Sequence, residues 1–174
     1  QCPKRATDEG EGCTWSGQLT NLKDHCRRCH WALITCPNRD LGCTHQGTRQ
    51  AVAQHMRICE HMGSSVTPLM LMSKNGDLAW MEYLIEEKAH DVGEVSHDGS
   101  TTLMLASKAG HLACVKYLVR QGAQVGDADQ GGTTALMFAS KEGHLECLQY
   151  LVTQNARVGQ TDQNGLNALM LASE

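Results

Sequence analysis

The fold is decided by a stretch that occurs four times, and one complete copy reads Thr101-Thr102-Leu103-Met104-Leu105-Ala106-Ser107-Lys108-Ala109-Gly110. The other copies begin at Thr67, Thr134 and Asn167, so successive copies are 34, 33 and 33 residues apart. Each complete copy predicts a short helix that ends at a glycine turn and is followed by a second, amphipathic helix. Because one such pair cannot bury its apolar face alone, the pairs are expected to stack into a solenoid.

The segments around these helices carry turn signals. Gly122 and Asn155 follow the second helices, where a left-handed residue ends a helix. The segments 129–132 and 162–165 have the Asp and Gly content of turns, and they predict projecting hairpin loops. For His111 and His144, which follow turn glycines, we expect a local hydrogen bond that closes the turn. For Cys114 and Cys147, we expect buried structural thiols.

The length and the residue pattern of the repeat resemble those of ankyrin repeats over residues 67–174. The resemblance implies a mostly α-helical solenoid of about three full units and part of a fourth. The chain departs from the family at the histidine of its opening tetrapeptide. The residues in its place are Met70, Met104, Met137 and Met170. We therefore expect the polar bridging of that histidine to be lost and an adaptable apolar ladder to replace it.

Ankyrin repeats imply a protein partner that is bound through hairpin loops and first-helix faces. The loop positions that this resemblance nominates are His97, Asp98, Asp129, Gln130, Gln163 and Asn164. Three lysines, Lys74, Lys108 and Lys141, share one position of the repeat and should line up on stacking. They have two interpretations: contact with an acidic partner segment, or a solvated face that keeps the stack soluble.

The first 62 residues are of another kind, since they hold seven of the nine cysteines together with five histidines. An odd cysteine count mixed with histidine favours metal ligation in a reducing compartment over a disulfide scaffold. A Gly-Cys pair followed by a His and a Cys occurs twice, thirty residues apart, and a Cys-Pro pair precedes each copy. The pattern predicts two structural zinc sites, with ligands Cys2, Cys13, His25 and Cys29, and Cys36, Cys43, His55 and Cys59.

Each His and its following Cys are four residues apart, which places both on one helix face. Cys26 and His30 have the same spacing, but the matching positions in the second copy are Met56 and Glu60. We therefore choose His25 and Cys29, and on similar grounds leave out His45 and His61. Four protein ligands leave no open position, so a catalytic zinc is not expected.

The second copy resembles a TRAF-type zinc finger in its Cys36-Pro37-Asn38 run, Gly42-Cys43, Gly47, His55 and Cys59. The resemblance spans residues 2–59 and implies two small ββα-like fingers, at 1–30 and 35–60, within a domain of residues 1–62. In the family such fingers commonly follow a RING domain in adaptors and ubiquitin ligases. A signalling adaptor, or the substrate-recognition part of a ubiquitin ligase, is thus the expected role.

Charge and composition limit the remaining classes of function. Residues 1–62 carry a net charge of +2 and residues 63–174 a net charge of −6, so neither half predicts a nucleic-acid surface. Nucleic-acid binding through Arg27 and Arg28 is the alternative. Neither a membrane span nor a signal peptide is visible. We expect no enzymatic activity, no small-molecule substrate, and a cytoplasmic or nuclear location.

Overall fold

The computed structural model describes residues 34–36, 43–56, 66–88 and 90–173. The chain divides into two compact units, Gln1–Ser64 and Ser65–Glu174, and each is described by itself. Several of the expected zinc ligands lie outside the described residues: Cys2, Cys13, His25, Cys29 and Cys59. Within the described part of the chain, no helix combines the length and the apolar character needed to cross a membrane.

The described part of the first unit is a two-stranded hairpin followed by a helix. Strand β1 (Ile34–Thr35) pairs antiparallel with β2 (Gln46–Gly47), so that Ile34 is opposite Gly47. Helix α2 (Arg49–Met56) follows at once, and the Thr48 hydroxyl accepts a hydrogen bond from the Ala51 amide at its first turn (3.3 Å). Val52 of this helix is fully buried.

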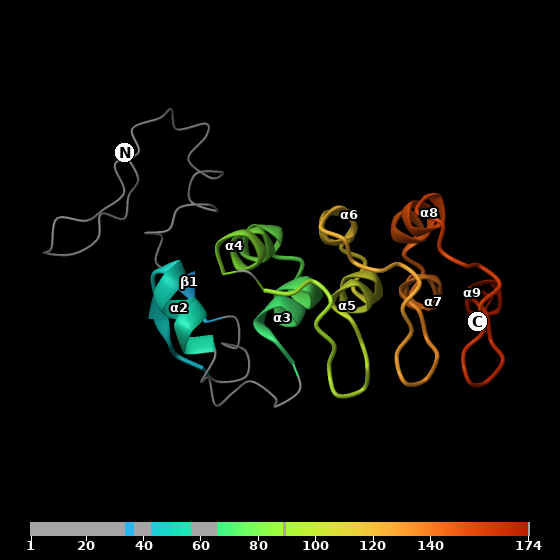
Figure 1. Cartoon of the computed structure of the whole chain (residues 1–174), viewed down its shortest axis with the longest axis horizontal. Coiled ribbons are helices and arrows are strands. Elements are labelled where there is room, and N and C mark those ends of the chain that lie inside the picture. The colour runs from blue at the N-terminus through green and yellow to red at the C-terminus, as the bar shows by residue number, and fades with distance from the viewer. Residues whose placement is uncertain (1–33, 37–42, 57–65, 89, 174) are drawn as a thin grey trace, which may run out of the picture. The chain divides into compact units, whose positions relative to one another are not determined.

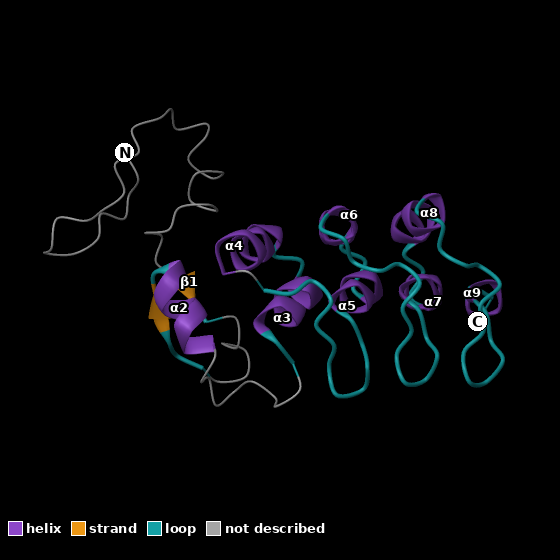
Figure 2. Ribbon diagram, in the orientation of Figure 1, coloured by secondary structure: helices purple, strands orange, loops and turns teal. Residues whose placement is uncertain are grey.

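The second unit is built from helix pairs. Their bounds are α3 (Pro68–Asn75), α4 (Leu78–Lys88), α5 (Thr102–Lys108), α6 (Leu112–Arg120), α7 (Ala135–Lys141), α8 (Leu145–Thr153) and the short α9 (Ala168–Leu171). The first helices of the pairs (α3, α5, α7 and α9) form one row, and the second helices (α4, α6 and α8) form another (Figure 1). Hairpin loops project from the first-helix row, on the side away from the second helices (Figure 2). This unit is therefore the helical solenoid that the repeats predict.

Each first helix begins at a side-chain cap. The hydroxyls of Thr67, Thr101 and Thr134 accept a hydrogen bond from the backbone amide three residues on, at 3.3 Å in each case. Such caps satisfy one of the amides that a helix N-terminus leaves unpaired.

Two methionines of the repeat make hydrogen bonds that the sequence does not predict. The sulfur atoms of Met104 and Met137 accept hydrogen bonds from the amides of Thr101 and Thr134, at 3.3 and 3.4 Å. These bonds were not expected from the sequence; they arise because a thioether is a weak acceptor.

The turns between the helices use left-handed residues where they were expected. Gly110, between α5 and α6, has φ 75°, and the residues after α6 and α8, Gly122 and Asn155, have φ 96° and 63°. Only glycine, and to a lesser degree asparagine, adopts this region readily. These positions confirm the helix ends that the sequence predicts.

The core of the stack consists of equivalent residues from successive repeats. Leu103 and Leu136 are 1% exposed, as are Met104 and Met137. Cys114 and Cys147 are buried on the second helices, and burial raises the pKa of the Cys114 thiol to about 11, with the Asp77 carboxylate as a further cause. Both cysteines are therefore structural thiols, as expected.

The histidines at the starts of α6 and α8 tie neighbouring repeats together. The His111 Nε2 atom lies 3.1 Å from the Lys74 carbonyl oxygen, and the His144 Nε2 atom lies 3.0 Å from the Lys108 carbonyl oxygen. The expected local bond is thus wrong, because the acceptor belongs to the preceding repeat. A Cβ atom at Gly110 would lie only 2.5 Å from His144 Nδ1, so the glycine also makes room for the ring.

Candidate functional site

Three expected metal ligands of the first unit come together. The ligand atoms of Cys36, Cys43 and His55 all lie within 4.8 Å of one another, and Cys43 Sγ is 3.2 Å from His55 Nε2. The hairpin brings the two cysteines close, since Cys36 directly follows β1 and its amide donates to the His45 carbonyl oxygen (2.8 Å). The helix α2 supplies the histidine.

The arrangement fits a metal ion. Ligands at the usual zinc–sulfur and zinc–nitrogen distances of a tetrahedral site would be about 3.5 Å apart, close to the observed sulfur–nitrogen separation. Cys36 and Cys43 are 1% and 4% exposed, so an ion between them would be shielded from water. The fourth expected ligand, Cys59, lies outside the described residues. The cluster could therefore bind a metal ion through at least three protein ligands.

His45 stacks on the ring of His55 and does not join the ligand cluster. Its ring stacks on that of His55, with centroids 4.0 Å apart and planes 14° from parallel. This residue, which the sequence leaves out of the ligand set, is not part of the cluster of three. The stacking instead restricts the orientation of the His55 imidazole.

The hairpin loops of the second unit hold most of the expected partner-binding residues, and the structure gives many of them internal partners. The Gln130 side chain donates to the His97 carbonyl oxygen (2.8 Å), and the Gln163 side chain donates to the Gln130 carbonyl oxygen (2.6 Å). Backbone bonds from Gln130 to Asp98 and from Gln163 to Gly131 run in the same direction. Successive loops are thus joined in a ladder.

The loop carboxylates are also engaged. One oxygen of Asp129 accepts from the amides of Gly131 and Thr133, both at 2.8 Å. One oxygen of Asp162 accepts in the same way from Asn164 (2.8 Å) and Leu166 (2.9 Å). These bonds lower the pKa of Asp162 below its ordinary value. Much of the polar chemistry that the sequence assigns to a partner therefore holds the loops in shape.

Asp98 follows the same plan, accepting hydrogen bonds from Ser96 and Ser100. His97 and Asn164 are exposed at the loop surface, and the Asn164 side-chain amide donates to the Asp162 carboxylate (3.4 Å).

The first helices present a second surface. Lys74, Lys108 and Lys141, here called the lysine column, are exposed in successive repeats. Three residues earlier in each helix stand Leu71, Leu105 and Phe138, here called the apolar column, which are partly exposed. Residues at that spacing share a helix face. The apolar column was not predicted, although the sequence shows an apolar residue at this repeat position each time.

The two columns meet across neighbouring helices. The Lys108 ammonium lies 5.3 Å from the centroid of the Phe138 ring, within the range of a cation–π interaction. This contact links α5 to α7 and holds Lys108 beside an apolar surface.

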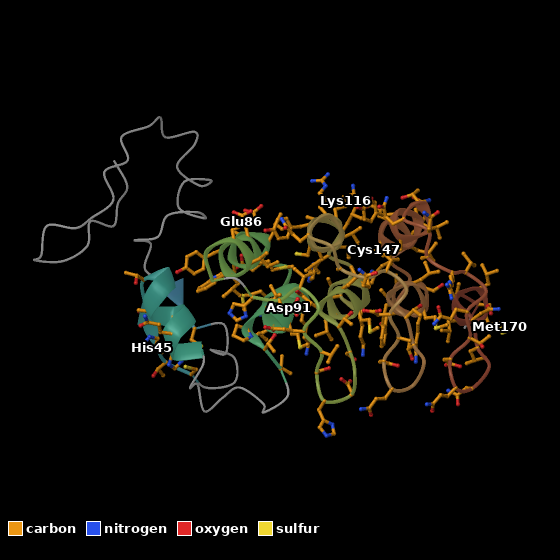
Figure 3. All side chains as sticks on the ribbon, viewed as in Figure 1. His45, Glu86, Asp91, Lys116, Cys147 and Met170 are labelled. Atoms are coloured by element: carbon orange, nitrogen blue, oxygen red, sulfur yellow. The ribbon has the colours of Figure 1, made fainter. Side chains whose placement is uncertain are left out.

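On the second-helix row, Lys116 makes a similar contact with Tyr150 at 5.6 Å, and the Tyr117 hydroxyl donates a hydrogen bond to Glu86 (3.2 Å). In Figure 3, Glu86 and Lys116 lie on the second helices, away from the hairpin loops.

With this geometry in hand, the comparison with known families decides the class of the protein. A family model described as ankyrin repeats, in three copies, matches residues 43–129, 69–162 and 122–174. The chain belongs to the ankyrin-repeat family. The ankyrin match begins at Cys43, within the hairpin and helix of the first unit, whereas the paired helices of the solenoid begin at Pro68. No TRAF-type zinc finger model matches the chain.

Ankyrin repeats generally mediate protein–protein interactions, and the chain carries the features that such a role needs. Its solenoid presents equivalent positions of successive repeats on one side, fixed in register by the histidine and glutamine bonds between repeats. A protein–protein interaction role for the second unit follows from family and geometry together.

Proposed function

We propose that this chain is an adaptor module whose ankyrin solenoid docks a partner protein and whose first unit is a zinc-stabilised finger pair. The chain would hold its partner without transforming it, so we propose no catalytic activity of its own. One observation carries the proposal. The inter-repeat bonds at 3.0 and 3.1 Å keep the exposed first-helix positions in register, which preorganises an extended binding surface.

Site-specific photo-crosslinking tests this proposal. A benzophenone amino acid would replace Asn75 on α3, His97 on the first hairpin loop, or Gln149 on α8, all of which are exposed. Each variant is expressed in the source cells and irradiated. We expect a discrete protein adduct from Asn75 or His97 and none from Gln149. If none of the three positions yields an adduct above the unirradiated control, the docking proposal fails.

The metal of the first unit is proposed to be zinc. Two thiolates and an imidazole are soft to borderline donors, which suit zinc in a closed structural site. The second site of the pair, with Cys2, Cys13, His25 and Cys29, is proposed from the sequence repeat alone. When bound, zinc would contribute folding free energy to this unit and supply no reactive water.

Metal analysis of the purified full chain tests the zinc proposal. We expect two zinc ions per chain, and about one after Cys43→Ser. Cys147→Ala removes a buried thiol outside the cluster and should leave the zinc content at two. A zinc content near zero in the unmodified chain, or an unchanged content after Cys43→Ser, would contradict the assignment.

A finer version of the proposal is that the full protein is a signalling scaffold or the substrate-recognition part of a ubiquitin ligase. Its support is the resemblance of residues 2–59 to fingers found in such proteins. A cytoplasmic or nuclear location agrees with it, because metal-binding thiols persist where cysteines are kept reduced. The test is to deplete the chain from cells and to measure ubiquitination of the crosslinked partner. A lower level of ubiquitination would support this version of the proposal, and an unchanged level would contradict it.

A further inference from the structure

The exposed face of the first helices combines two chemistries that the hairpin loops lack. The lysine column is exposed and positively charged, and none of its members forms a salt bridge with another described residue. The apolar column beside it is partly exposed in the three repeats that contain Leu71, Leu105 and Phe138, whereas the equivalent Leu171 is buried. This combination lies on a unit whose net charge is negative, so the positive stripe is a local feature and not a consequence of composition.

Acidic groups flank one end of the stripe. Glu142 is exposed next to Lys141, and the charge of Lys141 contributes to the lowered pKa of Asp162, after the loop's own hydrogen bonds. Lys141 is therefore partly neutralised within the chain. Among the described residues, neither Lys74 nor Lys108 contributes to a lowered carboxyl pKa, and Lys108 is held in place over the Phe138 ring. The positive field should be strongest toward α3 and α5.

We propose that this face binds an extended acidic peptide segment of a partner protein, with a carboxylate at every third residue and apolar residues between. The inference rests on the proposed docking function and specifies the chemistry of its partner. Carboxylates would pair with the lysine column, and the apolar residues would cover the apolar column. Both halves of the surface are then used by one ligand.

The spacing of the solenoid sets the spacing of the ligand. Packed helices lie about 8–10 Å apart, so successive lysines are separated by about that distance along the stack. A polyproline II segment rises about 3.1 Å per residue with three residues per turn, so every third side chain recurs on one side after about 9 Å. An extended peptide can therefore place one carboxylate at each lysine without bending.

Fluorescence anisotropy with synthetic peptides tests the proposal on the full chain. The probe is a fluorescein-labelled peptide with three Glu-Pro-Leu units. Three relatives test its parts: Gln replaces Glu, Ser replaces Leu, or the same residues are reordered so that the three Glu are adjacent. We expect the Glu-Pro-Leu peptide to bind most tightly. The Gln peptide should bind at least about tenfold more weakly, because three charge pairs are lost.

Two triple variants locate the site. Lys74→Glu, Lys108→Glu and Lys141→Glu together should weaken peptide binding by at least about tenfold. The matched control reverses the same number of charges off the first helices, at Lys116, Arg120 and Arg157. It should change the affinity by less than about threefold. Among single reversals, Lys108→Glu should weaken binding more than Lys141→Glu.

The possible results separate the inference from the proposed function. Equal binding to both triple variants, or no binding of the Glu-Pro-Leu peptide at millimolar concentration, would overturn the acidic-peptide inference. If a partner adduct at Asn75 still forms in that case, the docking function survives. A single-stranded oligonucleotide that binds the lysine column more tightly than the peptide would likewise overturn the inference in favour of nucleic acid. Its affinity should fall steeply with salt.

Discussion

The contact between Gly110 and His144 gives the most discriminating test of how the solenoid is held together. Gly110 and Gly143 occupy the same turn in successive repeats and have nearly the same backbone, with φ 75° and 73°. A Cβ atom at Gly110 would lie 2.5–2.8 Å from three atoms of the His144 ring, whereas a Cβ at Gly143 meets nothing within 4 Å. Gly110→Ala and Gly143→Ala thus differ in one contact.

The expected free energies of unfolding follow from this difference. Both variants force an alanine into the left-handed region, which costs about 1–2 kcal/mol. Both also gain similarly from a less flexible unfolded chain, so that effect cancels in the comparison. Gly110→Ala must in addition displace the His144 ring and lose its 3.0 Å bond to Lys108, a further loss of about 0.5–1.5 kcal/mol before any strain. We expect Gly110→Ala to be destabilised by at least about 1 kcal/mol more than Gly143→Ala.

Urea unfolding followed by far-ultraviolet circular dichroism and tryptophan fluorescence measures the two values, provided that both signals give the same transition. Two further variants complete a double-mutant cycle for Gly110 and His144. They are His144→Ala alone and His144→Ala combined with Gly110→Ala. Once the ring is gone, Gly110→Ala should cost no more than Gly143→Ala. Equal destabilisation of the two glycine variants in the unmodified background would refute the proposed role of the histidine between repeats.

Four further predictions follow from the same structure. Met137→Leu keeps the volume of a buried side chain and should cost less than about 1.5 kcal/mol in urea unfolding, whereas Met137→Ala should cost about 2–5 kcal/mol; equal costs would contradict the packing described here. Cys114 and Cys147, whose burial raises their thiol pKa, should resist iodoacetamide at neutral pH until denaturant is added, as mapped by mass spectrometry; rapid labelling of the native chain would show that the stack opens there. Asp98 accepts hydrogen bonds from Ser96 and Ser100 that lower its pKa below the ordinary 3.8, so its stabilising effect should be complete above that value and lost as the pH falls through the lowered one; an NMR titration of its carboxyl carbon that gives a pKa of 3.8 or higher would be inconsistent. Cys43→Ser should unfold the proposed finger at 35–60 and leave the helical circular dichroism of the second unit largely intact; loss of that helical signal as well would show that the two units do not fold independently.

The sequence predicts the solenoid well because its signals are local and repeated. A threonine cap, a turn glycine and a left-handed residue after the second helix each constrain a few neighbouring residues, and each recurs at a fixed interval. Thr101, Gly110 and Gly122 play the parts that their residue types indicate. The repeat length then leaves stacking as the way to bury the apolar faces.

The sequence predicts less about how each repeat meets the next. His111 and His144 were expected to bond locally, since sequence spacing shows near neighbours and not residues 36 or 37 positions away. Gln130 and Gln163 were nominated for a partner, yet their side chains bond to the preceding loop. The Met104 and Met137 sulfur bonds depend on rotamers that residue type alone does not determine.

For the candidate metal centre, the repeated spacing nominated three residues that the structure brings together. Cys36, Cys43 and His55 converge because a hairpin and the helix that follows it bring distant positions close in space. The apolar column was missed for a different reason. Partial exposure of Leu71, Leu105 and Phe138 is decided by stacking between repeats, and in the sequence these residues look like any other core position.

Hydrogen exchange of the full chain, alone and bound to the protein captured at Asn75, tests the docking account most directly. If the partner docks on this surface, its binding should slow exchange in the first helices α5 and α7 and in the hairpin loops at 96–100 and 128–133. Exchange in the second helices α6 and α8 should change little. Slowing confined to α6 and α8, with the first helices and loops unaffected, would contradict the claim that the partner binds to the first helices and hairpin loops.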